Sequence, residues 1–237
     1  MSRQAGAAAE RSKIRPRSLG ILGGTFNPPH RGHLALARHA RAELGLELVA
    51  LVPAYAAPHK SDGEGGGEGA RVDGGQAGGR DPGPTHRLRM CQLLLDGEQG
   101  LSACAIELER GGVSYTVDTL TSLHASHPQA ELTLILGADT AATLRSWREP
   151  TRLLELAALA IAAREGVPRQ PMLDALASLG AVERVSFLDM PAIDVSSSLV
   201  RQRAAGGESI EELVGAPVAR YIAEHHLYRV PAPAGGR

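Results

Sequence analysis

Short, almost uninterrupted apolar runs alternate along the chain with segments whose apolar residues recur at helical spacing. Strands that are apolar on both faces, with amphipathic helices between them, are typical of a parallel sheet covered by helices on both sides. We therefore predict a Rossmann-like, doubly wound α/β fold in a single domain with a helical C-terminal portion. The predicted strands are Leu19–Leu22, Leu48–Val52, Ala103–Leu108, Leu132–Leu136, Leu159–Ala162 and Val185–Leu188. The predicted helices are His33–Leu44, His86–Leu95, Val117–Ala125, Met172–Leu179, Ser197–Ala205 and Val218–His225.

Three segments lack this pattern. Residues 1–17 are polar and rich in Ala and Arg, and residues 231–237 are short and rich in Pro and Gly, so both are expected to be disordered tails. Residues 61–84 are dominated by Gly with scattered charges and predict a flexible insertion. The folded domain is therefore expected over residues 18–230. A lid function for the insertion and a passive insertion both remain open, the passive one being favoured.

Composition narrows the function classes. The chain has 237 residues, 43% of them hydrophobic, and a formal net charge of -1. This near-neutral balance does not favour a nucleic-acid binder, which needs a basic face. No apolar run approaches the length of a membrane span and no secretion signal is recognisable, so we expect a cytoplasmic protein without a membrane partner. The two cysteines have no paired spacing, which also favours a reducing compartment.

The segment Gly23–His33, GGTFNPPHRGH, combines features that suit a phosphate ligand. Two glycines directly after the first strand let the backbone approach whatever lies above the sheet. The next helix begins near His30–His33, so its free N–H groups and both imidazoles face the same place. Gly32 between the histidines leaves room for a bulky phosphate or adenine. Metal binding by the two histidines is an alternative, but no third ligand is obvious.

This string resembles the H-x-G-H signature of the nucleotidyltransferase superfamily, and within it the bacterial nicotinate-nucleotide adenylyltransferase family. That family commonly has Asp at the position of Asn27, so the chain keeps an acceptor there and loses a charge. The resemblance covers about residues 18–229 without the insertion. It implies that ATP is bound by Gly23, Gly24, Thr25, Phe26, His30, His33, Ser196, Ser197, Ser198 and Arg201.

Later motifs carry the same resemblance. PHK places His59 and Lys60 after the second strand, and Lys60 is expected to face substrate phosphates. The family pattern R-x-x-M falls on Arg87 and Met90, for which helix packing and loop support are the expected roles. PVARYIAEHHLY resembles the closing helix and is expected to be structural. The resemblance implies that nicotinate mononucleotide is bound by Asn27, Lys60, Tyr115, Thr116, Gly137, Asp139 and Trp147, the indole of Trp147 stacking on the pyridine ring.

The chemistry implied is adenylyl transfer from ATP to nicotinate mononucleotide, giving deamido-NAD and pyrophosphate in NAD biosynthesis. The expected catalytic groups are His30, His33, Lys60 and Arg201, and Mg²⁺ is expected to arrive mainly through the ATP phosphates. Two alternatives stay open: an adenylyltransferase of this fold with another acceptor, nicotinamide mononucleotide or phosphopantetheine, and a non-catalytic nucleotide sensor. A homo-oligomer is possible.

Overall fold

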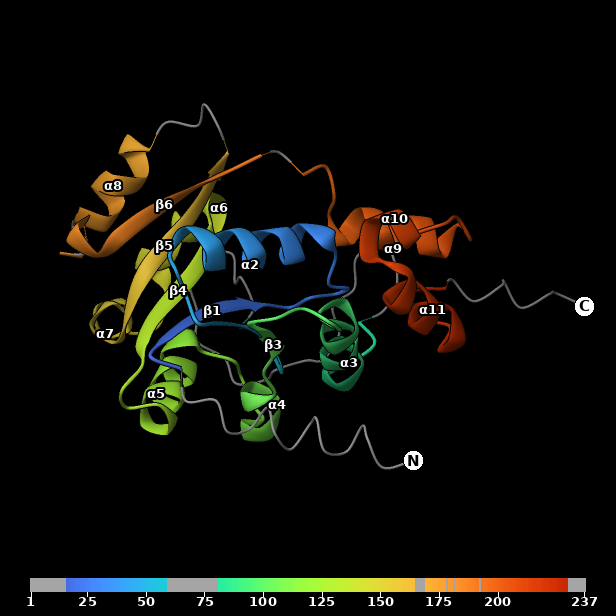
Figure 1. Ribbon diagram of the computed structural model, residues 1–237, viewed down its shortest axis with the longest axis horizontal. Helices are drawn as coiled ribbons and strands as arrows, with labels where there is room; N and C mark the ends of the chain where they lie inside the picture. The colour runs from blue at the N-terminus through green and yellow to red at the C-terminus, as the bar shows by residue number, and fades with distance from the viewer. Residues whose placement is uncertain are drawn as a thin grey trace, which may run out of the picture.

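The computed structural model describes residues 16–58, 81–164, 169–177, 179–180, 182–191 and 193–229. The N-terminal tail up to residue 15, most of the insertion, His59, Lys60 and the C-terminal tail lie outside these residues. Within the described part, the strands form one parallel, six-stranded sheet in the order β3-β2-β1-β4-β5-β6 (Figure 1). The predicted doubly wound α/β fold is confirmed.

The strands are β1 (Ser18–Gly24), β2 (Leu48–Pro53), β3 (Leu101–Ala103), β4 (Glu131–Gly137), β5 (Ala157–Arg164) and β6 (Val185–Met190). The longer helices are α2 (Arg31–Glu43), α3 (Pro84–Leu94), α5 (Thr116–Ser126), α8 (Gln170–Ala177), α9 (Ser197–Ala205) and α11 (Ala216–Glu224). The shorter ones are α4 (Ile106–Arg110), α6 (Ala138–Ala141), α7 (Pro150–Leu156), α10 (Glu211–Val214) and the 3₁₀ turns η2 (Leu144–Ser146) and η3 (Val182–Arg184). The helices of the second group were not predicted.

The strand predicted at Ala103–Leu108 is wrong. β3 ends at Ala103, and the chain then turns into the short helix α4. The helical conformation lets the buried Glu107 carboxylate accept a hydrogen bond from the Thr119 hydroxyl of α5, over 2.6 Å. A short apolar run alone cannot distinguish a strand from a helix. Here the helical conformation goes together with a hydrogen bond to the buried carboxylate of Glu107, which would be costly to leave without a partner.

α3 begins earlier than the predicted helix, inside the stretch 61–84. Gly83 precedes it with a φ of 94°, a left-handed value that suits glycine, and Pro84 occupies the first turn. The Asp81 carboxylate accepts from the Gly83 N–H over 2.9 Å and closes a small turn. The chain from Asp81 onward therefore belongs to the folded domain.

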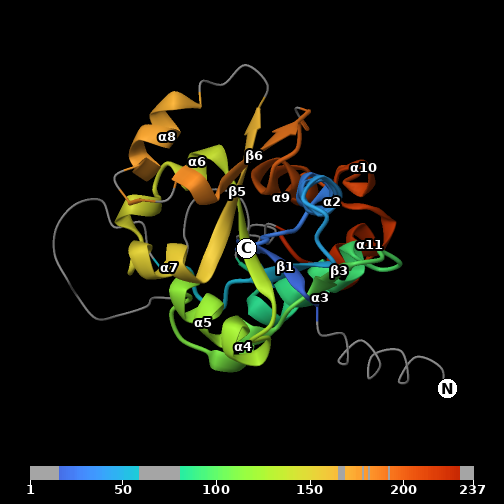
Figure 2. The same cartoon turned by 60° about the vertical axis from the view of Figure 1, so that its left-hand side comes forward.

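Helices cover both faces of the sheet and a third group closes one end. One face buries leucines of α5 and α7 against β1, β4 and β5, while the other buries Ala37 and Ala40 of α2 and Cys91 of α3. α9, α10 and α11 pack with α3 in a separate apolar cluster. Both views show this helical group beside α3 and the beginning of α2 (Figures 1 and 2).

The strand register defines where loops converge. β1 pairs with β2 on one side, where Gly24 lies opposite Pro53, and with β4 on the other, where Leu22 lies opposite Ile135. The strand order reverses at β1, so the crevice outside its carboxyl end is the expected ligand position in this fold. Gly23–His33 leaves the sheet at that point.

Candidate active site

The segment Gly23–His33, here called the phosphate loop, leaves β1 and enters α2. Phe26 adopts a left-handed φ of 50° and its ring is buried in the core. A side chain on Gly24 would come within 3.3 Å of that ring, which explains a glycine there. Phe26 as a whole is only 2% exposed, so its ring serves the core, and the predicted contact of its side chain with ATP is not supported.

The two predicted histidines lie together at the N-terminus of α2. His30 precedes the first helical residue, and its ring stacks on that of His33 with centroids 3.8 Å apart. The His33 Nδ1 accepts the backbone N–H of His30 over 3.2 Å, so a neutral His33 carries its proton on Nε2. The Nδ1 of His30 is buried without a hydrogen-bond partner among the described residues. The pair thus fixes the tautomer of a neutral His33, whose Nε2 carries the donor proton.

Burial keeps both rings neutral. It lowers the pKa of His30 to about 4. It also lowers the pKa of His33 to about 3, with a smaller contribution from the adjacent His30. Stacked imidazoles could not both be charged at this distance without strong repulsion. At neutral pH the histidines therefore act as hydrogen-bond donors without a positive charge.

Gly32 has a different role from the one predicted. A Cβ at this position would lie 3.0 Å from the His30 Nδ1 and 3.0 Å from the Val195 Cγ1. The space beside Gly32 is thus taken by the protein's own His30 ring and by the segment before α9. The prediction that Gly32 leaves room for a phosphate or adenine is therefore wrong: the glycine makes room for the His30 ring and Val195.

α9 holds the phosphate loop through side chains that bond its backbone carbonyls. The Ser197 hydroxyl donates to the Pro28 carbonyl over 2.8 Å, and Arg201 Nη1 donates to the Asn27 carbonyl over 2.7 Å. Arg201 Nη2 also donates to the Ser198 hydroxyl. The structure therefore brings the predicted Ser box and Arg201 against the predicted loop.

The three serines differ in whether their hydroxyl proton is available to a ligand. Ser196 is the N-cap of α9, its oxygen accepting the Leu199 N–H over 3.1 Å. The Ser197 hydroxyl donates its hydrogen bond to the Pro28 carbonyl. The hydroxyl oxygens of Ser196 and Ser198 instead accept hydrogen bonds, from the Leu199 N–H and from Arg201. A hydroxyl has one donor and two acceptor positions, and among the described residues the protons of Ser196 and Ser198 have no acceptor.

Arg87 ties the phosphate loop to the end of β2. Its guanidinium is 2% exposed and donates to three carbonyls: Thr25 (2.8 Å), Ala54 (2.6 Å) and Tyr55 (3.1 Å). The Arg87 Nε also pairs with Asp81 at 3.0 Å. The predicted role of Arg87 in loop support is confirmed, and Met90 one turn later is buried as expected.

Several of the predicted mononucleotide residues follow β4: Gly137 ends the strand, Asp139 lies in α6, and Trp147 follows η2. Arg148, directly after Trp147, places its guanidinium 4.8 Å from the Tyr115 ring centroid and 3.7 Å from the Asp118 carboxylate. It therefore joins the Trp147 segment to the start of α5, where Tyr115 precedes Thr116. The Trp147 indole N–H donates to the Thr143 hydroxyl over 3.1 Å.

Hydrogen bonds between the Tyr55 backbone and two side chains connect the phosphate loop with the region of Tyr115. Tyr55, whose carbonyl bonds Arg87, donates its own N–H to the Ser114 hydroxyl over 2.9 Å. Ser114 is the neighbour of Tyr115. Asp139 is exposed in the first turn of α6, with Gly137 as its N-cap. Contacts of Lys60 lie outside the described residues.

Comparisons with known proteins agree with this arrangement. A family model described as cytidylyltransferase-like matches residues 21–72 and 84–203. A protein of Bordetella petrii named "Probable nicotinate-nucleotide adenylyltransferase" is 40% identical over 215 residues, which cover 90% of this chain and 100% of the relative. Another of the same name, from Thermomicrobium roseum, is 37% identical over 89% of this chain and 91% of its own length. This chain belongs to the nicotinate-nucleotide adenylyltransferase family.

The solved structures extend the family likeness to the fold. Plasmodium falciparum nicotinic acid mononucleotide adenylyltransferase complexed with NaAD aligns with a TM-score of 0.65 and 18% identity, over 89% of this chain and 97% of the other. The family expected from the phosphate loop is thus confirmed. No helix in the described part of this family member could span a membrane.

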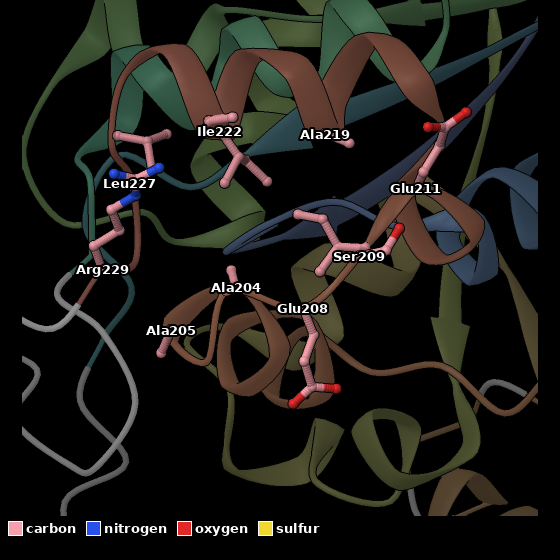
Figure 3. A pocket seen from close by; sticks show the side chains of 12 residues that line it. Ala204, Ala205, Glu208, Ser209, Glu211, Ala219, Ile222, Leu227 and Arg229 are labelled. Atoms are coloured by element: carbon pink, nitrogen blue, oxygen red, sulfur yellow. The ribbon is translucent and has the colours of Figure 1, made fainter.

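The protein also has a cavity of about 390 Å³ among α9, α10 and α11 (Figure 3). Residues such as Ala204, Ile222 and Leu227 line it, and no predicted site residue does. Two residues that contact predicted site residues, Arg148 and Tyr228, were not predicted from the sequence. Arg148 gave no signal besides its position beside Trp147, and Tyr228 was assigned to a structural segment although its hydroxyl donates to the Asn27 Oδ1 over 2.8 Å.

Proposed function

We infer that this chain transfers the adenylyl group of ATP to nicotinate mononucleotide, releasing pyrophosphate and deamido-NAD in NAD biosynthesis. The observation that carries this inference is the sequence identity, up to 40% over nearly the full length, to relatives named nicotinate-nucleotide adenylyltransferase. The stacked, neutral histidines at the N-terminus of α2 support it, because adenylyl transfer needs donors near the α-phosphate and no covalent enzyme nucleophile.

The reaction is a single in-line displacement. An oxygen of the acceptor's 5′-phosphate forms a bond to the α-phosphorus of ATP while the bond from that phosphorus to the α–β bridging oxygen breaks. The electron pair leaves with pyrophosphate, and no proton has to move. Positioning of the two phosphates and stabilisation of the charge on the α-phosphate oxygens therefore supply the catalysis.

The two histidines are suited to stabilising the negative charge that develops on the α-phosphate oxygens. A neutral His33 carries its proton on Nε2, because its Nδ1 accepts the His30 backbone N–H, and this proton would be the donor to the α-phosphate. His30, ordered by the stack and by Gly32, supplies the second donor when its ring proton faces the phosphate. Uncharged donors that are already in place gain strength as negative charge develops and need no reorganisation.

The pyrophosphate end is assigned to α9. Ser196 and Ser198 retain hydroxyl protons, and the backbone N–H groups of the first turn add a partial positive charge. Arg201 lies one turn further and would contribute its charge to the β- and γ-phosphates while still bonding the phosphate loop. Lys60 is proposed for the same phosphates from the sequence resemblance alone.

Mg²⁺ is proposed as the cofactor. Among the described residues there is no cluster of three or more His, Cys, Asp or Glu side chains suited to a metal ion. The ATP phosphates and water would therefore supply its ligands, as Mg²⁺ commonly prefers. When bound, Mg²⁺ would neutralise charge on the leaving pyrophosphate.

Acceptor selection is assigned to Asn27, Tyr115, Thr116, Gly137, Asp139 and Trp147. The contact of Arg148 with the Tyr115 ring supports one continuous recognition surface for the mononucleotide. Stacking of the nicotinate ring on Trp147 uses the face of the indole, since its N–H is already bonded to Thr143.

The deciding experiment is pyrophosphate release from ATP with nicotinate mononucleotide, nicotinamide mononucleotide or phosphopantetheine as acceptor. We expect the highest kcat/KM with nicotinate mononucleotide. Preference for either other acceptor would overturn the substrate assignment. ATP binding without release for every acceptor would identify a nucleotide sensor. The cytoplasmic location and a possible homo-oligomer stay predictions, to be checked by fractionation and light scattering.

A further inference from the structure

The C-terminal end of the described chain reaches back to the phosphate loop. After α11 the backbone makes a tight turn in which His226 and Tyr228 adopt left-handed φ values of 52° and 64°. Such values are uncommon for side chains of this size and persist where the surroundings determine them. The turn buries the Tyr228 ring to 4% exposure in the cluster formed by α3, α9, α10 and α11. The ring is thus held firmly by packing that does not involve its hydroxyl.

The hydroxyl has a specific partner. It donates to the Asn27 Oδ1 over 2.8 Å, across 201 positions of sequence. Other bonds to the phosphate loop go to its backbone: Arg87 bonds the Thr25 carbonyl, Arg201 the Asn27 carbonyl and Ser197 the Pro28 carbonyl. Among the hydrogen bonds described here, Tyr228 alone holds the Asn27 side chain. With Oδ1 engaged, the amide protons of Asn27 are the groups left for a ligand.

The surroundings keep this hydroxyl a donor. Burial raises the pKa of Tyr228 well above its ordinary value, and the negative charge of Asp81 acts in the same direction. The opposing influence of Arg201 and Arg87 is smaller. The phenol is therefore protonated at neutral pH and available as the donor to Asn27.

We propose that Tyr228 is a positioning residue for adenylyl transfer, whose hydroxyl orients Asn27 and with it the segment that presents His30 and His33. The inference rests on the proposed function for its kinetic test. A residue with only a packing role would need the ring and could lose the hydroxyl without kinetic effect. Tyr228 instead couples the closing segment of the chain to the reacting phosphates.

The test is Tyr228→Phe, which removes the hydroxyl and keeps the ring. Tyr221→Phe is the matched control, because Tyr221 on α11 also uses its hydroxyl, toward His86 at 2.9 Å and away from the loop. We expect kcat of Y228F to fall about tenfold, with the KM for ATP changed less, since small misplacements of reacting groups cost turnover. Y221F should stay within twofold of wild type. Equal kcat values for Y228F and wild type, or equal losses in both variants, would overturn the proposal.

A double-mutant cycle shows whether the effect passes through Asn27. In an Asn27→Ala background the hydroxyl has lost its acceptor, so adding Y228F should change kcat less than twofold. A persistent tenfold effect would mean that Tyr228 acts through general packing. If Y228F does not fold, N27A removes the same bond with the ring in place, and kcat of N27A within twofold of wild type would refute the proposal.

Histidine ring resonances separate failure of this inference from failure of the proposed function. The ¹⁵N and ¹H shifts of His30 and His33 should move in Y228F and not in Y221F, whichever reaction the protein catalyses. If wild type releases no pyrophosphate but these shifts move, the adenylyl-transfer assignment fails and the positioning role stands. If wild type is active and neither shifts nor kcat change in Y228F, the positioning role fails.

Discussion

Replacing Arg87 by Met should destabilise the protein more than almost any other single arginine substitution in its described part. The side chain is 2% exposed and donates to three backbone carbonyls, so Met would fill much of the volume and satisfy none of them. Each buried carbonyl that loses its donor costs about 1–3 kcal/mol, so losing the donor to these three carbonyls should cost about 3–5 kcal/mol in total. The ion pair with Asp81 adds little to this figure, because that carboxylate is 40% exposed and its attraction is screened by water.

Urea unfolding followed by the fluorescence of Trp147, the sole tryptophan, gives the free energy of unfolding directly. The expected loss corresponds to a fall in Tm on the order of 10 °C for a chain of this size. Arg89→Met is the control, because Arg89 lies on the same helix, is exposed and bonds only Gln92 among the described residues. A loss below about 1 kcal/mol for R87M, or one no larger than that of R89M, would refute the reasoning.

Four further outcomes follow from the site. His33→Ala should lower kcat by about 10²–10³-fold, as removal of a single stabilising donor does; turnover within threefold of wild type would contradict its role. The pKa values of His30 (about 4) and His33 (about 3) lie below the unfolded value near 6.5. Below pH 6.5 the unfolded chain therefore binds protons that the folded chain does not. The free energy of unfolding should fall from pH 6.5 toward pH 4, by up to about 1.4 kcal/mol per pH unit for each histidine. Urea titrations at pH 7.5 and 5 check this, and H33A should show a smaller loss than wild type. Gly32→Ala should displace the His30 ring and lower kcat, with Tm as a control, since its Cβ would meet that ring at 3.0 Å; unchanged kcat would count against the packing argument. Ser196→Ala should cost about 1 kcal/mol through loss of the α9 cap, measured by thermal unfolding; an unchanged Tm would show that the cap contributes little.

The sequence predicts the phosphate loop well because its signals are local. Two glycines after an apolar run and paired histidines before a helical pattern lie within eleven positions, and each has a direct steric or electrostatic meaning. The role of Arg201 beside the loop came only through the family resemblance. Hydrogen bonds from side chains to backbone carbonyls leave no pattern in the residues that accept them.

Two other misses have the same physical origin. The strand predicted over Ala103–Leu108 failed because a short apolar run carries no period, and the partner of Glu107 lies twelve positions away on another helix. Tyr228 was read as structural because its position in a closing helix says nothing about an acceptor 201 positions earlier. Positions that depend on distant partners need the fold before they can be interpreted.

The contacts that join Asn27 to Arg201 and Tyr228 also bear on how the protein is made. These bonds span 174 and 201 positions, so the phosphate loop leaves the ribosome well before its supports, Arg201 and Tyr228, have been synthesised. A nascent chain would contain the phosphate-binding motif long before the residues that orient this motif had been synthesised. Products terminated before Arg201 would retain the motif and lack both supports, and we expect them to be inactive.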